Sequence, residues 1–243
     1  MEDKIYGRNP VIEALLSGRE IDKVCLQDGL THSQISKIAA LCKERSIPFR
    51  FVNRKKLDEL SGNGNHQGVV AYAAAHKYAS VEDILDLARE KGEPPFILIA
   101  DGLSDPHNLG SFIRTANAAG MHGIIIPKNR STGLSATVAK VAAGAVEHTL
   151  VAKVSNIAQT IEKLKKEGVW GAGTDLSAKE YHYNSDLKGA LAVVIGSEGE
   201  GISRLVREKC DFLVKIPMIG EIESLNASVA AGVLIYEAVR QRS

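Results

Sequence analysis

The six residues ESLNAS, 223–228, place a carboxylate, two hydroxyls and an amide between an apolar strand pattern and an apolar helix pattern. One such residue would serve as an N-cap, because a Ser or Asn oxygen accepts hydrogen bonds from the unpaired amides of a first helical turn. Three candidates, Ser224, Asn226 and Ser228, exceed what capping requires. The segment is therefore either a solvated loop or the edge of a binding site.

A second candidate segment is GSEGEG, residues 196–201, which follows the apolar run ALAVVIG. Its Gly-x-x-Gly-x-Gly spacing matches neither the dinucleotide fingerprint nor the P-loop, which requires Gly-Lys-Ser/Thr. The segment contains two acids and no base, which disfavours phosphate binding. It is either a plain strand-to-helix turn or a place where the backbone comes close to a neutral or cationic ligand.

Asn108 and Arg114 lie six residues apart in HNLGSFIRT, where a helix pattern begins. Taken singly, Asn108 is typical of a helix cap and Arg114 of a surface charge. The histidines His66, His107 and His148 lack the spacing of metal ligands, which favours a structural role for each. We expect no metal site.

The elements that must position these residues are short apolar runs separated by helical patterns. The runs are FILIAD, GIIIP, HTLVAK, VWGAGTD, ALAVVIG and FLVKIP. Six alternations of strand and helix predict an α/β fold with a largely parallel, doubly wound sheet. Ligands of such sheets bind beyond the carboxyl ends of the strands, which is where the polar segments fall. Together they form a plausible site.

The first 75 residues read as a separate small α/β unit. Its expected strands are IDKVCLQ, IPFRFV and QGVVAYAA, and its expected helices are NPVIEALLSG, HSQISKIAALCKER and RKKLDELSG. Asn9 is expected to cap the first helix, with Pro10 at its first position. Residues 76–94 contain a helix pattern and end on Gly-Glu-Pro-Pro, so we expect domains at 1–75 and 95–243 joined by a linker at 76–94.

Composition narrows the class of protein. A net charge of +1 and 5% aromatic residues argue against a strongly basic nucleic-acid coat or extensive base stacking, but allow a local basic patch. The three cysteines form no CxxC, which favours reduced thiols over a disulfide framework or zinc site. The opening MEDKIYG lacks the apolar core of a signal peptide, and no apolar run has the length of a membrane span. A cytoplasmic protein is expected.

Taken together and in order, NLGSFIRTANAAG, GSEGEGIS and IPMIGEIESLNASVAAGVLIYE resemble the SpoU/TrmH branch of the SPOUT RNA methyltransferases. The resemblance covers the chain from Phe96 to its end. YGRNPVIEAL and NHQGVVA resemble the N-terminal substrate-binding domain of bacterial 23S rRNA guanosine-2'-O-methyltransferases, whose fold is like that of ribosomal protein L30e. The resemblance implies methylation of a ribose 2'-hydroxyl by S-adenosylmethionine without metal, a homodimer formed through the catalytic domain, and a C-terminal trefoil knot. General topology rules would not predict a knot.

The resemblance also assigns roles to residues. It places the cofactor against main-chain groups of Gly196, Ile216 and Leu225, and Gly173 and Thr174 are expected to line the same pocket. An adenine ring held by backbone hydrogen bonds would suit these apolar strand ends.

Arg114 resembles the arginine proposed in the family to accept the 2'-hydroxyl proton. Because a guanidinium is normally always protonated, Arg114 is expected to be essential, either as the base helped by a substrate phosphate or as a phosphate and oxyanion binder. Asn108 and Glu198 are expected to hold Arg114 and the ribose, and Ser224 and Asn226 to complete that network.

The substrate side leaves alternatives open. A basic corner at Arg50, Arg54, Lys55 and Lys56 is either a grip on RNA phosphates or a solvated surface. The activity is 23S rRNA guanosine 2'-O-methylation or tRNA ribose 2'-O-methylation, and a non-catalytic RNA-binding protein of the same fold is the alternative from another class. A nucleotide-binding dehydrogenase is disfavoured because the Gly-x-Gly-x-x-Gly fingerprint is missing.

Overall fold

The computed structural model describes residues 4–243, so the first three residues of the expected 1–75 domain lie outside the described residues. The chain forms two compact units: one contains the residues up to Lys77 together with Gly133–Thr137, and the other contains Tyr78–Thr132 and Val138–Ser243. Each unit is described by itself. Among residues 4–243, no helix has both the length and the apolar character that a membrane span needs.

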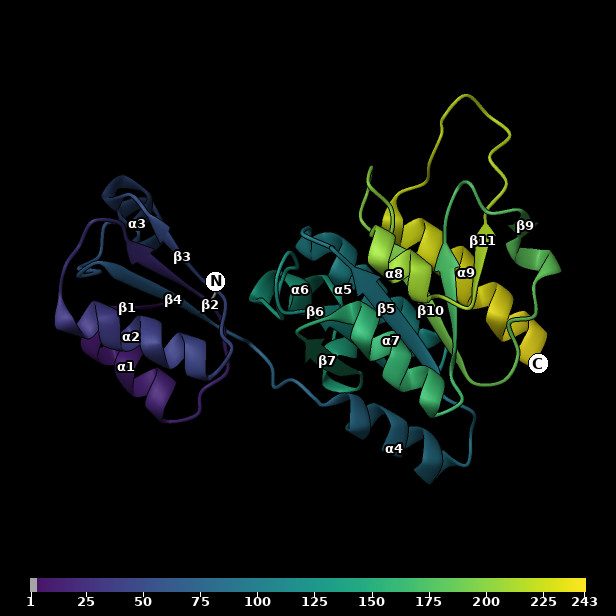
Figure 1. The fold of residues 1–243 in the computed structure, drawn as a ribbon, viewed down its shortest axis with the longest axis horizontal. Helices are drawn as coiled ribbons and strands as arrows, with labels where there is room; N and C mark the ends of the chain where they lie inside the picture. The colour runs from purple at the N-terminus through teal and green to yellow at the C-terminus, as the bar shows by residue number, and fades with distance from the viewer. Residues whose placement is uncertain (1–3) are drawn as a thin grey trace. The chain divides into compact units, whose positions relative to one another are not determined.

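The first unit is a four-stranded sheet with helices on both faces. Its elements are β1 (Lys4–Tyr6), α1 (Arg8–Leu16), β2 (Ile21–Gln27), α2 (Ser33–Glu44), β3 (Phe49–Val52), α3 (Arg54–Ser61) and β4 (Val69–Ala73). The strand order is β1-β4-β2-β3. Helices α1 and α2 pack on one face around a core that includes Leu15, Leu26 and Ile38, and α3 covers the other face with Leu57 (Figure 1).

The expected cap of the first helix is wrong. Helix α1 begins at Arg8 after Gly7, whose φ of 95° is a conformation that glycine adopts readily. Asn9 lies inside the first turn, where its Oδ1 accepts from Nε2 of Gln34 at 2.7 Å and so ties α1 to α2. Pro10 follows it and is tolerated because amides of the first turn have no partner within the helix.

The second unit is a seven-stranded sheet in which every pairing is parallel, in the order β7-β6-β5-β10-β8-β11-β9. Its strands are β5 (Phe96–Asp101), β6 (Gly123–Pro127), β7 (Leu150–Val154), β8 (Trp170–Thr174), β9 (Glu180–Tyr181), β10 (Leu191–Gly196) and β11 (Phe212–Lys215). All six predicted strands are confirmed. The two-residue β9 was not predicted, because it is too short to show a pattern.

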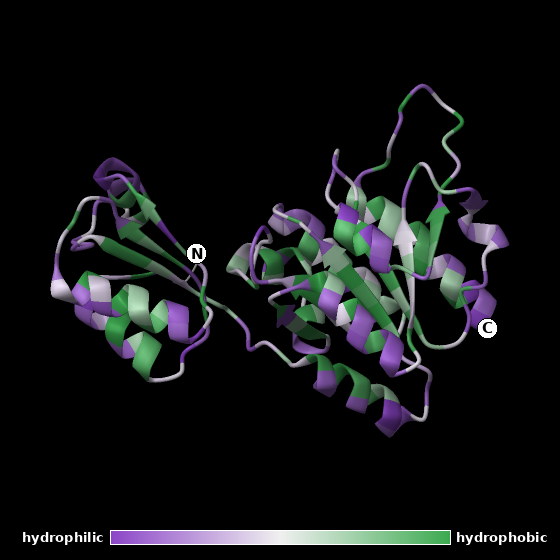
Figure 2. Ribbon diagram, in the orientation of Figure 1, coloured by the Kyte–Doolittle hydropathy of each residue, from purple (hydrophilic) through white to green (hydrophobic). Residues whose placement is uncertain are grey.

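Helices cover both faces of this sheet, and Figure 2 shows its strand β5 as strongly apolar. They are α4 (Val81–Lys91), α5 (Pro106–Ala118), α6 (Ala136–Val141), α7 (Ile157–Lys166), α8 (Arg204–Lys209) and α9 (Ala227–Arg242), with short 3-10 turns at Ala145–Glu147 and His182–Asn184. Side chains of α4, α7 and α8 share one core with the sheet, while α5 and α9 pack against each other and contact β6 and β10. The fold is therefore the expected α/β architecture. The C-terminal knot stays a prediction.

Most of the expected linker, 76–94, belongs to the second unit, which begins at Tyr78. Its helix α4 starts with a capping box formed by Ser80 and Asp83 and buries Ile84, Leu85 and Ala88. Burial of these apolar side chains explains why the segment is a packed helix.

The strand order creates one natural binding edge. From β5 the sheet grows in one direction through β6 and β7, and later strands are added on the other side, with β10 next to β5. The chain therefore leaves the carboxyl ends of β5 and β10 on diverging paths, and such a switch point is where open parallel sheets bind ligands.

Candidate active site

A pocket of about 420 Å³ lies at the carboxyl ends of β8, β10 and β11. The predicted residues that line it are Thr174, Gly196, Glu198, Ile216, Ser224 and Leu225. A long loop, residues 216–226, projects from the sheet between β11 and α9 and supplies one wall (Figure 1). Four of the five predicted cofactor residues, all except Gly173, therefore face one cavity.

The GSEGEG segment forms a tight turn after β10. Ser197 and Gly201 exchange two backbone hydrogen bonds of 3.1 and 3.0 Å, and the three residues between them form the tip. Gly199 and Gly201 have φ values of 88° and 67°, in the left-handed region that favours glycine. This turn carries Glu198 at its tip.

Both predicted cofactor glycines are crowded by the protein's own packing, Gly196 by backbone and Gly173 by side chains. A Cβ on Gly196 would lie 1.9 Å from the carbonyl carbon of Gly201, so the returning turn leaves no room for a side chain. A Cβ on Gly173 would lie 2.8 Å from Leu213 and 2.9 Å from the Cys210 sulfur. The geometry therefore requires glycine at residue 196, because this chain's own backbone packs against it.

Asn108, Glu198 and Asn226 form a hydrogen-bonded triangle beside the pocket. Nδ2 of Asn108 donates to Oε1 of Glu198 at 3.1 Å, and Nδ2 of Asn226 donates to Oδ1 of Asn108 at 3.1 Å. Asn226 also donates to Oε1 of Glu198, and the amide of Ala227 approaches the same oxygen at 3.4 Å. The expected association of these three residues is thus present, although they come from α5, the turn after β10 and the start of α9.

The same triangle explains the polar segment ESLNAS. Oδ1 of Asn226 caps α9 by accepting from the amides of Ser228 at 2.9 Å and Val229 at 3.4 Å. Its Nδ2 is thereby turned toward Glu198, so one side chain both caps the helix and positions the carboxylate. Within the part of the chain that the structure describes, Oε2 of Glu198 accepts no hydrogen bond, which leaves this oxygen available to a ligand.

Asn108 can join the triangle because another residue caps its helix. Asp105 is the N-cap of α5 and accepts from the amide of His107 at 2.8 Å, while Asn108 is only 5% exposed. A buried amide needs hydrogen-bond partners, and the triangle supplies them.

Arg114 and Ser224 are not bonded to the triangle. Both are exposed, and neither has a hydrogen-bond or ion-pair partner among residues 4–243. Arg114 lies on α5 about 9 Å further along the helix axis than Asn108. The expected contact of Asn108 and Glu198 with Arg114 is therefore absent here, while Ser224 borders the pocket from the loop.

Three further polar residues at this edge were missed. Asp101, the last residue of β5, accepts the amide hydrogen of Ser203 at 2.7 Å and ties the start of α8 to the sheet. Asp175, directly after β8, forms an ion pair with Arg207 of α8 at 3.1 Å, and both line the pocket. An acid at the end of a buried strand was a signal for Asp101 and Asp175, but no sequence pattern pairs Asp175 with Arg207.

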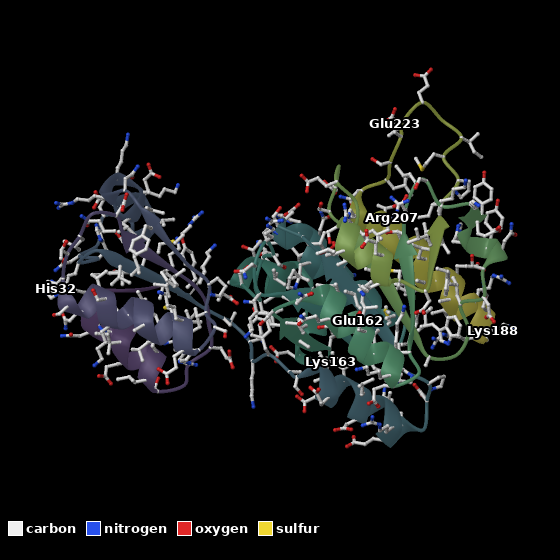
Figure 3. All side chains as sticks on the ribbon, in the orientation of Figure 1. His32, Glu162, Lys163, Lys188, Arg207 and Glu223 are labelled. Atoms are coloured by element: carbon white, nitrogen blue, oxygen red, sulfur yellow. The ribbon has the colours of Figure 1, made fainter. Side chains whose placement is uncertain are left out.

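The pocket carries more acids than bases. Its lining contains the carboxylates of Asp175, Glu198, Glu200 and Glu223 and the cations of Arg207 and Lys215. Figure 3 labels Arg207, on α8, and Glu223, on the projecting loop. The excess of negative charge favours a cationic ligand over an anionic one.

The sulfur of Cys210 lies beside Gly173 of β8, and its thiol is not activated. Burial raises the pKa of its thiol to about 12, so it stays protonated at neutral pH. Among residues 4–243, no group of three His, Cys, Asp or Glu side chains is placed to hold a metal ion.

Comparison with known proteins identifies both units. Residues 95–236 match the SpoU rRNA Methylase family, and residues 4–79 match the RNA 2'-O ribose methyltransferase substrate binding family. The chain is 52% identical to YacO of Bacillus subtilis, a protein named for the TrmH family of tRNA/rRNA methyltransferases, over 99% of this chain and 96% of that protein.

Two solved structures show how far the likeness extends. An AdoMet-bound rRNA methyltransferase from Sinorhizobium meliloti is 25% identical, with a TM-score of 0.60, and covers 98% of this chain and 86% of its own. The TrmH/SpoU tRNA-modifying enzyme of A. aeolicus is 28% identical, with a TM-score of 0.56, and covers 66% of this chain and 82% of its own. With its two family matches and its relative at 52% identity, this chain belongs to the SpoU rRNA methylase family.

Proposed function

We propose that this chain, an RNA 2'-O-ribose methyltransferase of the TrmH/SpoU family, modifies a guanosine of 23S rRNA in the cytoplasm. The observation that carries the proposal is the pocket at the carboxyl ends of β8, β10 and β11, bordered by the Asn108–Glu198–Asn226 triangle. It joins a cavity for a small ligand to a set of fixed polar groups.

The extent of the structural likeness supports rRNA as the substrate. The rRNA methyltransferase from S. meliloti matches 98% of this chain, including its N-terminal unit. The tRNA-modifying enzyme of A. aeolicus matches only 66%. An additional unit that matches a substrate-binding family fits a large, folded RNA, which offers contacts far from the modified nucleotide.

The cofactor is S-adenosylmethionine, and the pocket has the properties that this ligand needs. Its volume of about 420 Å³ lies within the usual range of small-molecule sites. Ile195, Ile202, Val214, Ile216 and Leu225 supply apolar surface for an adenine ring. The surplus of carboxylates suits the positive sulfonium and ammonium groups. We propose that main-chain groups of residues 196, 216 and 225 hold the cofactor, with Thr174 at the pocket edge.

The reaction needs alignment and removal of a proton. Bound S-adenosylmethionine would supply the methyl group to the ribose 2'-oxygen and would leave as a neutral thioether, while the 2'-hydroxyl proton would pass to a base. The triangle fixes Glu198 with one oxygen free, so we propose that Glu198 orients the ribose and that Asn108 and Asn226 hold Glu198. Ser224, exposed at the pocket edge, adds a hydroxyl toward the substrate.

Arg114 acts on the RNA side in this proposal. Its guanidinium is exposed and has no partner among residues 4–243, so it is accessible to a phosphate of the substrate. A planar guanidinium binds a phosphate and a developing oxyanion together, which stabilises the transition state more than the ground state. Glu198, whose Oε2 accepts no hydrogen bond among residues 4–243, is available to accept the proton.

We also propose that the chain is a homodimer formed through the catalytic domain. Helix α9 leaves Val229, Gly232, Val233 and Tyr236 on the side that the sheet and α5 do not bury, at the i, i+3, i+4, i+7 spacing of one helix face. Val229 and Tyr236 are each 50% exposed. A second copy would cover this stripe, and analytical ultracentrifugation of Tyr236→Glu tests whether the dimer dissociates.

The experiment that tests the substrate is a map of 2'-O-methyl positions in rRNA and tRNA from cells with and without the gene. Loss of one guanosine methyl in 23S rRNA is the expected result. Loss of a methyl group in tRNA instead would replace the proposed substrate, and no loss in either RNA would contradict the activity on these molecules.

A further inference from the structure

Three strands of the N-terminal unit bring two lysines and a tyrosine into one row. Lys4 on β1 is the register partner of Tyr72 on β4, and Tyr72 is the partner of Lys23 on β2. Register partners point to the same face of a sheet. This face also carries α3, because Tyr72 packs in one cluster with Leu57 of that helix.

Tyr72 acts as a platform for the two lysines. The ammonium nitrogen of Lys23 lies 4.3 Å from the centre of its ring and that of Lys4 lies 5.7 Å from it. Tyr72 is only 7% exposed, whereas both lysines are exposed. Cation–π attraction to a ring fixed in the core limits the freedom of two flexible side chains and holds their charges together at the surface.

A third cation extends the row toward the edge of the sheet. Arg50 on β3 is the register partner of Cys25, which lies two residues beyond Lys23 on β2. Val52, two residues after Arg50, packs in the cluster under α3, so Arg50 points to the same face as Lys23. We call Lys4, Lys23, Arg50 and the Tyr72 ring the Tyr72 patch.

The two acids of α3 have partners outside this patch. Asp58 contacts the ring of His66 at 2.9 Å, and Glu59 forms an ion pair with Lys56 at 2.9 Å. The second pair also removes one cation from the basic corner expected from the sequence. That corner is divided in the structure: Arg50 belongs to the sheet face, while Arg54 and Lys55 begin α3.

We infer that the Tyr72 patch binds the sugar–phosphate backbone of the RNA substrate, an inference that rests on the proposed function. The patch offers three cations, two of them held in place, which suits a run of phosphates. The ring is buried and cannot stack on a base, so the contact carries affinity and orientation but no sequence information.

The main test measures RNA binding by the full-length protein at several salt concentrations, with in vitro transcribed 23S rRNA as the probe. Lys4→Glu/Lys23→Glu is expected to weaken binding at least ten-fold. Lys4→Ala/Lys23→Ala is expected to reduce the slope of log K against log salt by about 0.7 to 0.9 per lysine. The matched control is Lys37→Glu/Lys43→Glu, which makes an equal charge change on α2, on the other face of the sheet. The RNA affinity of this control is expected to stay within two-fold of wild type.

A second series separates the platform from the charges. Tyr72→Phe keeps the ring and is expected to bind like wild type. Tyr72→Leu keeps an apolar side chain against Leu57 but removes the ring, so affinity is expected to fall a few-fold while the salt slope stays the same. An unchanged urea-unfolding transition of the N-terminal unit in every variant shows that the mutated sheet remains folded, and unchanged S-adenosylmethionine affinity shows the same for the other unit.

The outcomes distinguish this inference from the proposed function. Wild-type RNA affinity in Lys4→Glu/Lys23→Glu would overturn the inference. That result would not contradict the proposed methyl transfer to 23S rRNA. A loss confined to Arg54→Glu/Lys55→Glu also overturns it and assigns the contact to α3. If the wild-type enzyme methylates tRNA and not 23S rRNA, the proposed substrate fails, and the same variants titrated with that tRNA still decide whether the patch binds RNA.

Discussion

Two groups of polar side chains belong to the proposed site, and the protein holds them differently. Asn108, Glu198 and Asn226 bond to one another across three elements. Arg114 and Ser224 are exposed and have no hydrogen-bond or ion-pair partner among residues 4–243. The first group is positioned by folding, whereas the second can be positioned only by a ligand. Changes in the first should therefore alter stability and geometry together, and changes in the second should alter turnover alone.

The largest effect is expected at Arg114. Arg114→Ala and Arg114→Lys should both lower single-turnover methyl transfer about 100- to 1000-fold, because lysine keeps the charge but loses the planar fork. Cofactor affinity should stay within a few-fold of wild type and the melting temperature should not change, since the side chain has no partner within the described chain. Methyl transfer to rRNA fragments, measured beside cofactor titration, is the test.

The matched control is Lys163→Ala, an exposed cation on α7 of the same unit, which should transfer methyl groups normally. Substantial turnover in Arg114→Lys would remove Arg114 from the catalytic residues. A fall in melting temperature would instead move Arg114 into the group that folding positions.

The second effect concerns the turn that carries Glu198. Gly196→Ala puts a Cβ 1.9 Å from the Gly201 carbonyl carbon, so the turn must open and the unfolding free energy should fall by about 3 kcal/mol or more. Cofactor affinity should fall with it, because the turn lines the pocket. Gly220→Ala, where nothing lies within 4 Å of the new Cβ, is the control. Normal stability with lost cofactor binding in Gly196→Ala would mean that the ligand, and not the turn, excludes the side chain.

Gly196 also shows what could be predicted from the sequence. Its segment predicted either a plain strand-to-helix turn or a close approach of the backbone to a ligand, and the family resemblance placed the cofactor there. The structure shows the backbone of Gly201, five residues later, packed against Gly196, and the cofactor contact stays a prediction. A sequence motif can indicate a close approach at a glycine, but only the folded structure shows which group lies there.

The sequence predicted the elements whose burial produces a recognisable hydrophobic pattern. It did not predict the elements that are too short to show one. Strands buried on both faces, such as β5 and β10, are continuous apolar runs and were predicted. Strands β1 and β9 have three and two residues and show no periodicity. Helix α4 was predicted as a helix, but its packing on the sheet depends on β7, which lies about 60 residues later in the chain.

The site was predictable as a set of residues and not as a set of contacts. Asn108, Glu198 and Asn226 stood out as polar residues at strand ends. Asn108 bonds to residues 90 and 118 positions away, and no local pattern encodes such a pairing. Arg114 was grouped with them because of the family motif, and the structure separates it from them.

The third prediction compares two polar residues of one loop. Asn226→Ala removes the cap of α9 and leaves the buried oxygen of Asn108 without its donor, so we expect a loss of about 2 kcal/mol in unfolding free energy. Ser224→Ala, two residues earlier, should change it by less than about 0.5 kcal/mol, because the hydroxyl is exposed and unpaired within the described residues. Urea unfolding of both variants decides whether the two groups differ as described. Equal losses would contradict the distinction.

The smallest effect is expected at a polar group that is positioned by folding far from the pocket. His122 is 2% exposed; its Nδ1 accepts from the amide of Phe96 at 3.0 Å, and its Nε2 lies 3.1 Å from Glu93. Burial lowers the pKa of His122 below 6.5, and the charge of Lys91 lowers it further, while Glu93 opposes the shift. The folded protein therefore keeps this imidazole neutral with its hydrogen on Nε2.

The sign of the pH effect follows from proton binding. Below pH 6.5 the unfolded chain binds a proton on His122, whereas the folded chain does not bind it until the pH reaches the lowered pKa. The unfolding free energy should therefore fall as the pH drops from 6.5 toward that pKa. The slope from one group is at most about 1.4 kcal/mol per pH unit. His122→Asn keeps an acceptor for the Phe96 amide but cannot titrate, so its unfolding free energy should depend less on pH between 6.5 and 5. Urea unfolding of both proteins across this range gives the difference, in which other titrating groups cancel.

Cofactor affinity should be the same in both, because His122 meets the sheet at the amino end of β5, opposite the pocket. Parallel stability curves would mean that the pKa of His122 is the same in the folded and unfolded protein. A change in cofactor affinity would show that groups fixed by folding at the far edge of the sheet still influence the site.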